Sequence, residues 1–104
     1  MITIGVDAHK RVHVAYAIDE AGRETGQWRG ANNASGWREL FAWAGAFGGE
    51  RQWGIEGAWS YGRSLAQFLV GCGEMVFDVT RDGPPSDAGG VGIRRRMTRS
   101  MREQ

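Results

Sequence analysis

The sequence predicts an α/β domain built on a mixed five-stranded sheet of strand order 3-2-1-4-5. Two observations indicate this class: three segments with strand character follow one another through short turns, and two segments with helical periodicity then alternate with two further strands. A third observation limits the domain to residues 1–80. Residues 81–104 contain no Trp, Phe, Tyr or Leu and are rich in Gly and Arg, so we expect a disordered basic tail there.

The first three predicted strands form an antiparallel meander. Residues 2–6 are an apolar run that ends at Asp7, and residues 12–18 alternate between larger apolar side chains and small or polar ones. Residues 19–22 (DEAG) are typical of a hairpin turn. Residues 23–29 are more polar, which suits a strand at the edge of a sheet.

The second half of the domain alternates helices with strands. Asn32-Asn33 is a candidate N-cap for a first helix, and a second helix is expected over residues 60–70. Each helix leads into a strand, at residues 51–56 and 74–79 respectively. Strands joined through a helix pair in parallel by right-handed crossovers, and the resulting order β-β-β-α-β-α-β is that of a ribonuclease H-like fold.

Composition and charge exclude several classes of protein. The 104 residues suffice for one domain, and no run of 18 apolar residues is present to span a membrane. The N-terminus has no signal-peptide pattern, and the single cysteine, Cys72, excludes an internal disulfide, so we expect a cytoplasmic protein. The net charge is −2 over residues 1–80 and +3 over residues 81–104.

Two carboxylates stand at the ends of predicted strands. Asp7 ends the first strand and Glu56 the fourth; these strands are neighbours in the predicted order, so both side chains should emerge at one edge of the sheet. Adjacent carboxylates repel each other unless a cation bridges them, and Mg²⁺ prefers hard oxygen ligands. The pattern permits a metal site at Asp7 and Glu56. The alternative is an Asp in a turn and a solvated Glu at a strand end.

Basic side chains suggest contacts with nucleic acid. Lys10 lies close to Asp7 in the sequence, and Arg94, Arg95 and Arg96 form a cluster in the tail that could bind phosphates. The alternative is that they are solvated, and a non-catalytic nucleic-acid-binding or dimerising fragment stays open as a function. Half of an actin- or sugar-kinase-like ATPase is a further alternative, although residues 8–11 lack the glycine of a phosphate-binding turn.

Four segments resemble a known family in order and in spacing. Residues 4–10 (IGVDAHK), 34–37 (ASGW), 54–62 (GIEGAWSYG) and 76–79 (VFDV) are similar to the N-terminal domain of the DEDD transposases of the insertion-sequence-110 family. The resemblance covers residues 2 to about 80.

The resemblance implies a RuvC-like, ribonuclease H-like domain in which four acids, in the order Asp, Glu, Asp, Asp, bind Mg²⁺ for DNA strand cleavage and exchange. By position, Asp7 is the first acid and Glu56 the second. The family further implies DNA as the substrate, a guide RNA as a partner, a separate domain with a serine nucleophile, and a homo-oligomer in the full-length protein.

The sequence departs from the family pattern after the fifth strand. In the family, the third and fourth acids belong to an Asp-Pro-Ile-Asp-Ala-like motif. Residues 81–104 lack this motif, so we expect this chain to be inactive alone.

A frameshift after about residue 80 would account for the loss of the motif. Residues 97–102 (MTRSMR) can be encoded as ATG-ACN-CGN-TCN-ATG-CGN, and the frame that begins at the G of the first ATG then reads GAC-NCG-NTC-NAT-GCG, which permits Asp-Pro-Ile-Asp-Ala.

Overall fold

The computed structural model of the chain describes residues 1–81 and 95–100, with side chains as far as residue 79. Six strands and two helices occur in this part of the chain. In chain order they are β1 (Ile2–Ala8), β2 (Val12–Ile18), β3 (Glu24–Ala31), α1 (Ala34–Gly45), β4 (Arg51–Glu56), α2 (Arg63–Gly71), β5 (Val76–Arg81) and β6 (Arg95–Ser100). None of the described helices is long and apolar enough to cross a membrane.

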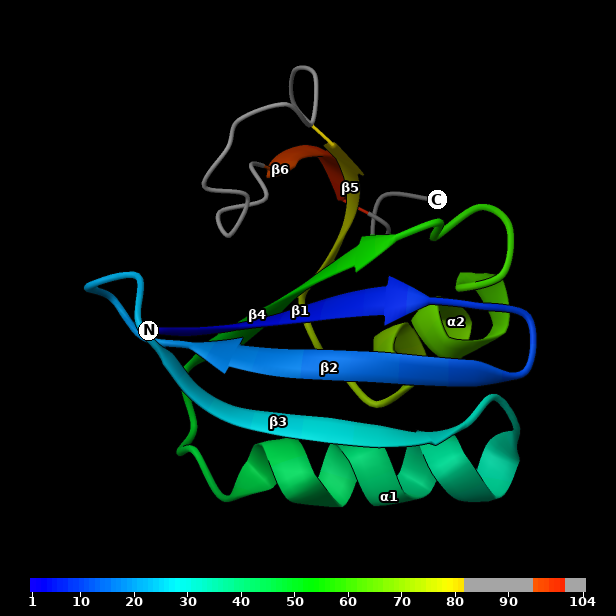
Figure 1. The fold of residues 1–104 in the computed structure, drawn as a ribbon, viewed down its shortest axis with the longest axis horizontal. Helices are drawn as coiled ribbons and strands as arrows, with labels where there is room; N and C mark the ends of the chain where they lie inside the picture. Colours follow the sequence, from blue (N-terminus) through cyan, green and yellow to red (C-terminus); the bar gives the residue numbers. More distant parts are fainter. Residues whose placement is uncertain (82–94, 101–104) are drawn as a thin grey trace.

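All the strands belong to one mixed sheet of order β3-β2-β1-β4-β5-β6 (Figure 1). The first three strands pair antiparallel, and β4 lies parallel both to β1 and to β5. The predicted order 3-2-1-4-5 is therefore confirmed. The hairpin turn between β2 and β3 is also confirmed, with Gly22 at a positive φ of 84° and the Asp19 carboxylate accepting the backbone N–H groups of Ala21 and Arg23.

The structure departs from the predicted tail at β6. Residues 95–100 pair antiparallel with β5, where the sequence led us to expect disorder. A strand at an open sheet edge is held by backbone N–H and C=O groups, so a segment without core-forming side chains can still pair there. The rest of the predicted tail, residues 82–94 and 101–104, lies outside the described residues.

The second helix starts later than the sequence predicts. Residues 57–62 form a turn in which Gly57 has a positive φ of 80° and accepts a 2.7 Å backbone hydrogen bond from Gly62. The helix α2 begins only at Arg63. Ser60 and Tyr61, which were assigned to the helix, therefore belong to the turn that follows Glu56.

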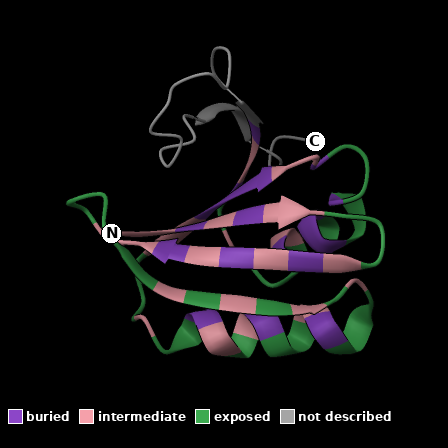
Figure 2. Cartoon of the chain, in the orientation of Figure 1, coloured by how far each residue is buried: buried purple, intermediate pink, exposed green. Residues whose placement is uncertain are grey.

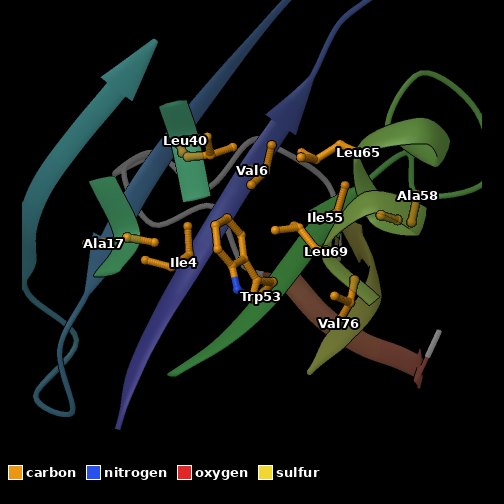
Figure 3. Packing of buried hydrophobic residues seen from close by; sticks show 13 residues of the cluster. Ile4, Val6, Ala17, Leu40, Trp53, Ile55, Ala58, Leu65, Leu69 and Val76 are labelled. Atoms are coloured by element: carbon orange, nitrogen blue, oxygen red, sulfur yellow. The ribbon is translucent and has the colours of Figure 1, made fainter. Parts of the chain in front are cut away.

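The core lies on one face of the sheet, beneath both helices. Alternate residues of the central strands are buried together with residues of both helices, and Figure 2 shows the buried positions on β1, β2 and β4. In Figure 3 the side chains of Leu65 and Leu69 on α2 point toward Ile55 and Trp53 on β4. Since successive strand residues point to opposite faces, the residues between these core positions lie on the other face of the sheet.

Candidate metal site at the ends of two strands

Asp7 and Glu56 lie side by side at the ends of β1 and β4. In the parallel ladder Val6 pairs with Ile55, and the next pair along is Asp7 with Glu56. Val6 and Ile55 are buried in the core, so the two carboxylates that follow them leave the sheet on the face opposite the helices. The expectation that both acids emerge at the same edge is confirmed; their roles as metal ligands and catalytic residues stay a prediction.

The turn after β1 places a histidine beside the first carboxylate. The Nε2 atom of His9 lies 3.4 Å from Asp7 Oδ2, and 37% of the Asp7 side chain is exposed. The His9 backbone N–H donates to the Val12 carbonyl at 3.0 Å and to His13 Nδ1 at 3.3 Å. These bonds fix the backbone of the turn at His9.

The turn after β4 packs directly against the end of β1. A Cβ atom added at Gly62 would lie 2.6 Å from Ile55 Cγ2 and 3.2 Å from Ala8 Cβ, so only glycine fits there. The same turn carries two of the large apolar side chains that are exposed, Trp59 at 40% and Tyr61 at 55%. The residues that follow each acid are thus in close contact with each other.

The donor type of the two carboxylates is the one that a hard divalent cation prefers. Mg²⁺ is commonly held by one or two protein carboxylates, with water completing its coordination shell. Across residues 1–81 and 95–100, no group of three or more His, Cys, Asp or Glu side chains is placed to hold a metal ion. Asp78, the next acid along the sheet, pairs with Ile55 rather than with Glu56, which places it on the opposite face. Among the described residues, Asp7 and Glu56 are thus the two acids that the sheet pairs directly, and their binding of an ion stays a prediction.

The four basic residues predicted to contact nucleic acid lie in different parts of the chain, and the structure describes three of them. Lys10 is exposed in the turn that follows β1, three residues after Asp7. Arg95 and Arg96 lie in β6, where they pair with Arg81 and Thr80 of β5. Arg94 lies outside the described residues. Phosphate contacts by these four basic residues stay a prediction.

Sequence reasoning missed the role of one residue near the site. Asn33 does cap α1, since its Oδ1 accepts the Gly36 N–H at 2.9 Å. Its neighbour Asn32 takes no part in that cap; its side chain instead bonds to the two turns that follow the acids. Nothing in the local sequence signals this, because the carbonyl groups that it bonds lie 22 and 29 residues away.

Comparison with known proteins agrees with this architecture. The family model of the DEDD transposases of the insertion-sequence-110 type, described as a transposase, matches residues 4–81. No curated protein matches the chain. The matched segment contains most of β1, all of the elements from β2 to β5 and both carboxylates, and it spans more than half of the 104 residues. The chain therefore belongs to the insertion-sequence-110 family of DEDD transposases.

Proposed function

We propose that this chain contributes Asp7 and Glu56 to a Mg²⁺-dependent site for DNA strand cleavage and exchange in DNA transposition. The observation that carries the proposal is the pairing of Asp7 with Glu56 at the ends of parallel strands, within the segment that matches the transposase family. When bound, Mg²⁺ supplies a positive charge that stabilises the negative charge developing on a phosphodiester.

The side chains around the carboxylates support the same chemistry. Asp7 and Glu56 would supply the oxygen ligands, and the His9 Nε2 atom lies 3.4 Å from the Asp7 carboxylate. Lys10 adds an exposed positive charge in the turn that follows Asp7, available to a DNA phosphate. The chain's own residues thus hold the cation and attract the phosphate.

We infer that these 104 residues do not complete strand exchange by themselves. The sequence contains no Asp-Pro-Ile-Asp-Ala motif, and two carboxylates are fewer than a two-metal phosphodiester site requires. Guide RNA and assembly into a homo-oligomer are further properties that membership of the family suggests for the full-length protein, whereas cytoplasmic location is proposed from the single cysteine.

A titration with Mn²⁺, followed by electron paramagnetic resonance, tests the metal site. We expect Asp7→Asn and Glu56→Gln each to weaken Mn²⁺ binding about 10-fold or more, because each removes one of two charged ligands. Glu39→Gln is the matched control, because it removes an exposed carboxylate on α1. Equal Mn²⁺ affinity in the two site variants, the control and the unmodified chain would contradict the proposal.

Binding of single-stranded DNA over a series of salt concentrations tests the basic residues. Each phosphate contact on a single strand contributes about 0.7 to the slope of log K against log salt concentration. We expect the triple variant R94Q/R95Q/R96Q to lower that slope by about 2, and Lys10→Gln by a smaller amount. An unchanged slope in both variants would mean that these side chains are only solvated.

A further inference from the structure

One asparagine side chain forms hydrogen bonds to both the turn that follows Asp7 and the turn that follows Glu56. Asn32 lies between β3 and the N-cap of α1. Its Nδ2 donates to the carbonyl groups of Lys10 at 3.0 Å and His9 at 3.5 Å, in the turn after Asp7. The same Nδ2 donates to the Tyr61 carbonyl at 3.4 Å, in the turn after Glu56.

Further bonds fix Asn32 itself. Its backbone N–H donates to the Arg11 carbonyl at 2.9 Å, which is a third bond to the first turn. Its Oδ1 accepts the indole N–H of Trp37 at 3.0 Å. These partners decide which way the amide group faces, because a carbonyl group can only accept a hydrogen bond and an indole N–H can only donate one.

We propose that Asn32 is a positioning residue for the metal site. By bonding to the turn after Asp7 and to the turn after Glu56, it sets how far apart the two carboxylates are held. This inference rests on the proposed function. The ladder between β1 and β4 ends at the Asp7–Glu56 pair itself, so beyond that pair the spacing of the two strand ends depends on contacts outside the ladder, such as the packing of Gly62 against Ala8 and the bonds of Asn32 to both turns. Asn32 makes such a link with one side chain. Metal ligands have to be held to about 0.5 Å for tight binding, and residues that orient them commonly decide affinity.

The polarity of the amide group makes the inference specific. In Asn32→Asp the acceptor for the Trp37 indole stays, but an oxygen replaces the donor and faces carbonyl oxygens. We therefore expect Asn32→Asp to weaken metal binding at least as much as Asn32→Ala. In Trp37→Phe the donor bonds of Asn32 to both turns stay in place, so its effect on the metal should be smaller.

The Mn²⁺ affinity of these variants, measured by electron paramagnetic resonance on the full 104-residue chain, tests the inference. We expect Asn32→Ala and Asn32→Asp to weaken Mn²⁺ binding about 10-fold or more, which is typical when a residue that supports metal ligands is removed. The matched control is Asn33→Ala, which removes the cap of the same helix but has no bond to either turn. It should lower the melting temperature while leaving the Mn²⁺ affinity within about twofold of the original, since caps act on helix stability.

The outcomes separate this inference from the function on which it rests. If the unmodified chain binds no Mn²⁺, the proposed function fails and the positioning role fails with it. If the unmodified chain binds Mn²⁺ and a folded Asn32→Ala variant binds it equally well, only the positioning role is overturned. Equal weakening in Asn32→Ala and Asn33→Ala would also overturn it, because the loss would then follow helix stability. If Asn32→Ala does not fold, the nearly isosteric Asn32→Asp decides the question against the same control.

Discussion

At the scale of single residues, His13 is the buried titratable group next to the site. It is fully buried on β2, its Nδ1 accepts the His9 N–H at 3.3 Å, and its Nε2 has no hydrogen-bond partner among the described residues. Burial lowers the pKa of His13 from its usual 6.5. The imidazole is therefore neutral in the folded chain at neutral pH, as accepting a bond at Nδ1 requires.

This burial predicts a loss of stability in mild acid. The unfolded chain binds a proton on His13 near pH 6.5, whereas the folded chain does so only at a lower pH. Protonation of His13 therefore leaves the free energy of unfolding unchanged well above pH 6.5. Below pH 6.5 this free energy falls, by up to about 1.4 kcal/mol per pH unit, until the pH reaches the pKa of His13 in the folded chain. Urea unfolding between pH 7.5 and 5.5 measures this slope. His13→Leu should remove the slope and His9→Asn should keep it; a slope that persists in His13→Leu would contradict this interpretation.

Residues differ in how far the sequence reveals their roles. Asp7 and Glu56 could be predicted because a strand end is a local feature, and the strand order makes the two ends neighbours. The role of Asn32 could not, because it depends on where two distant turns lie after folding. In the local sequence Asn32 and Asn33 are equivalent candidates for the cap, and only the folded chain distinguishes them.

At the scale of elements, the turn at residues 57–62 packs between the end of β1 and the end of β4 and so affects the distance between these two strand ends. Its sequence includes Ser60 and Tyr61 at helical spacing from later apolar residues, which is why the helix was predicted to start too early. The tertiary contact of Gly62 with Ile55 and Ala8 favours the turn instead. This packing is a property of the folded sheet, and helical periodicity does not reveal it.

A glycine substitution in this turn should be costly. Gly62→Ala places a methyl group 2.6 Å from the buried Ile55 side chain and 3.0 Å from the Gly57 carbonyl oxygen, so we expect a loss of about 1–3 kcal/mol, as for other overpacked sites. Gly71→Ala is the control within α2, because nothing lies within 4 Å of its added Cβ, and it should stabilise the helix by up to about 1 kcal/mol. Thermal unfolding followed by circular dichroism measures both, and equal melting temperatures would exclude the tight packing at Gly62.

At the scale of the whole molecule, the sheet follows the predicted order as far as β5 and then gains β6. The apolar periodicity of residues 1–80 carries enough information to order five strands, because the buried faces and the crossovers permit few arrangements. Residues 95–100 lack that periodicity, and their pairing with β5 rests on backbone geometry, which the side-chain pattern does not report. The family match ends at residue 81, where the composition also changes.

The frameshift hypothesis makes a prediction about the nucleotide sequence that encodes residues 97–102. We expect codons 97–102 of the gene to spell Asp-Pro-Ile-Asp-Ala in the frame that begins at the third nucleotide of the Met97 codon, because the residues encoded in the visible frame permit it. We further expect a transposase reading frame to continue downstream in that register. Sequencing the gene and its downstream DNA checks both points. A stop codon soon afterwards in that register, or codons that do not spell the motif, would refute the frameshift.

The location of a bound metal ion is the most direct test of a metal site at Asp7 and Glu56. Crystals of the chain soaked in Mn²⁺ would reveal the ion by its anomalous scattering, independently of any activity. We expect an anomalous peak within about 2.5 Å of carboxylate oxygens of both Asp7 and Glu56, at the edge of the sheet where β1 and β4 end. A peak that is bound elsewhere on the chain, or no peak at this edge at saturating Mn²⁺, would contradict it.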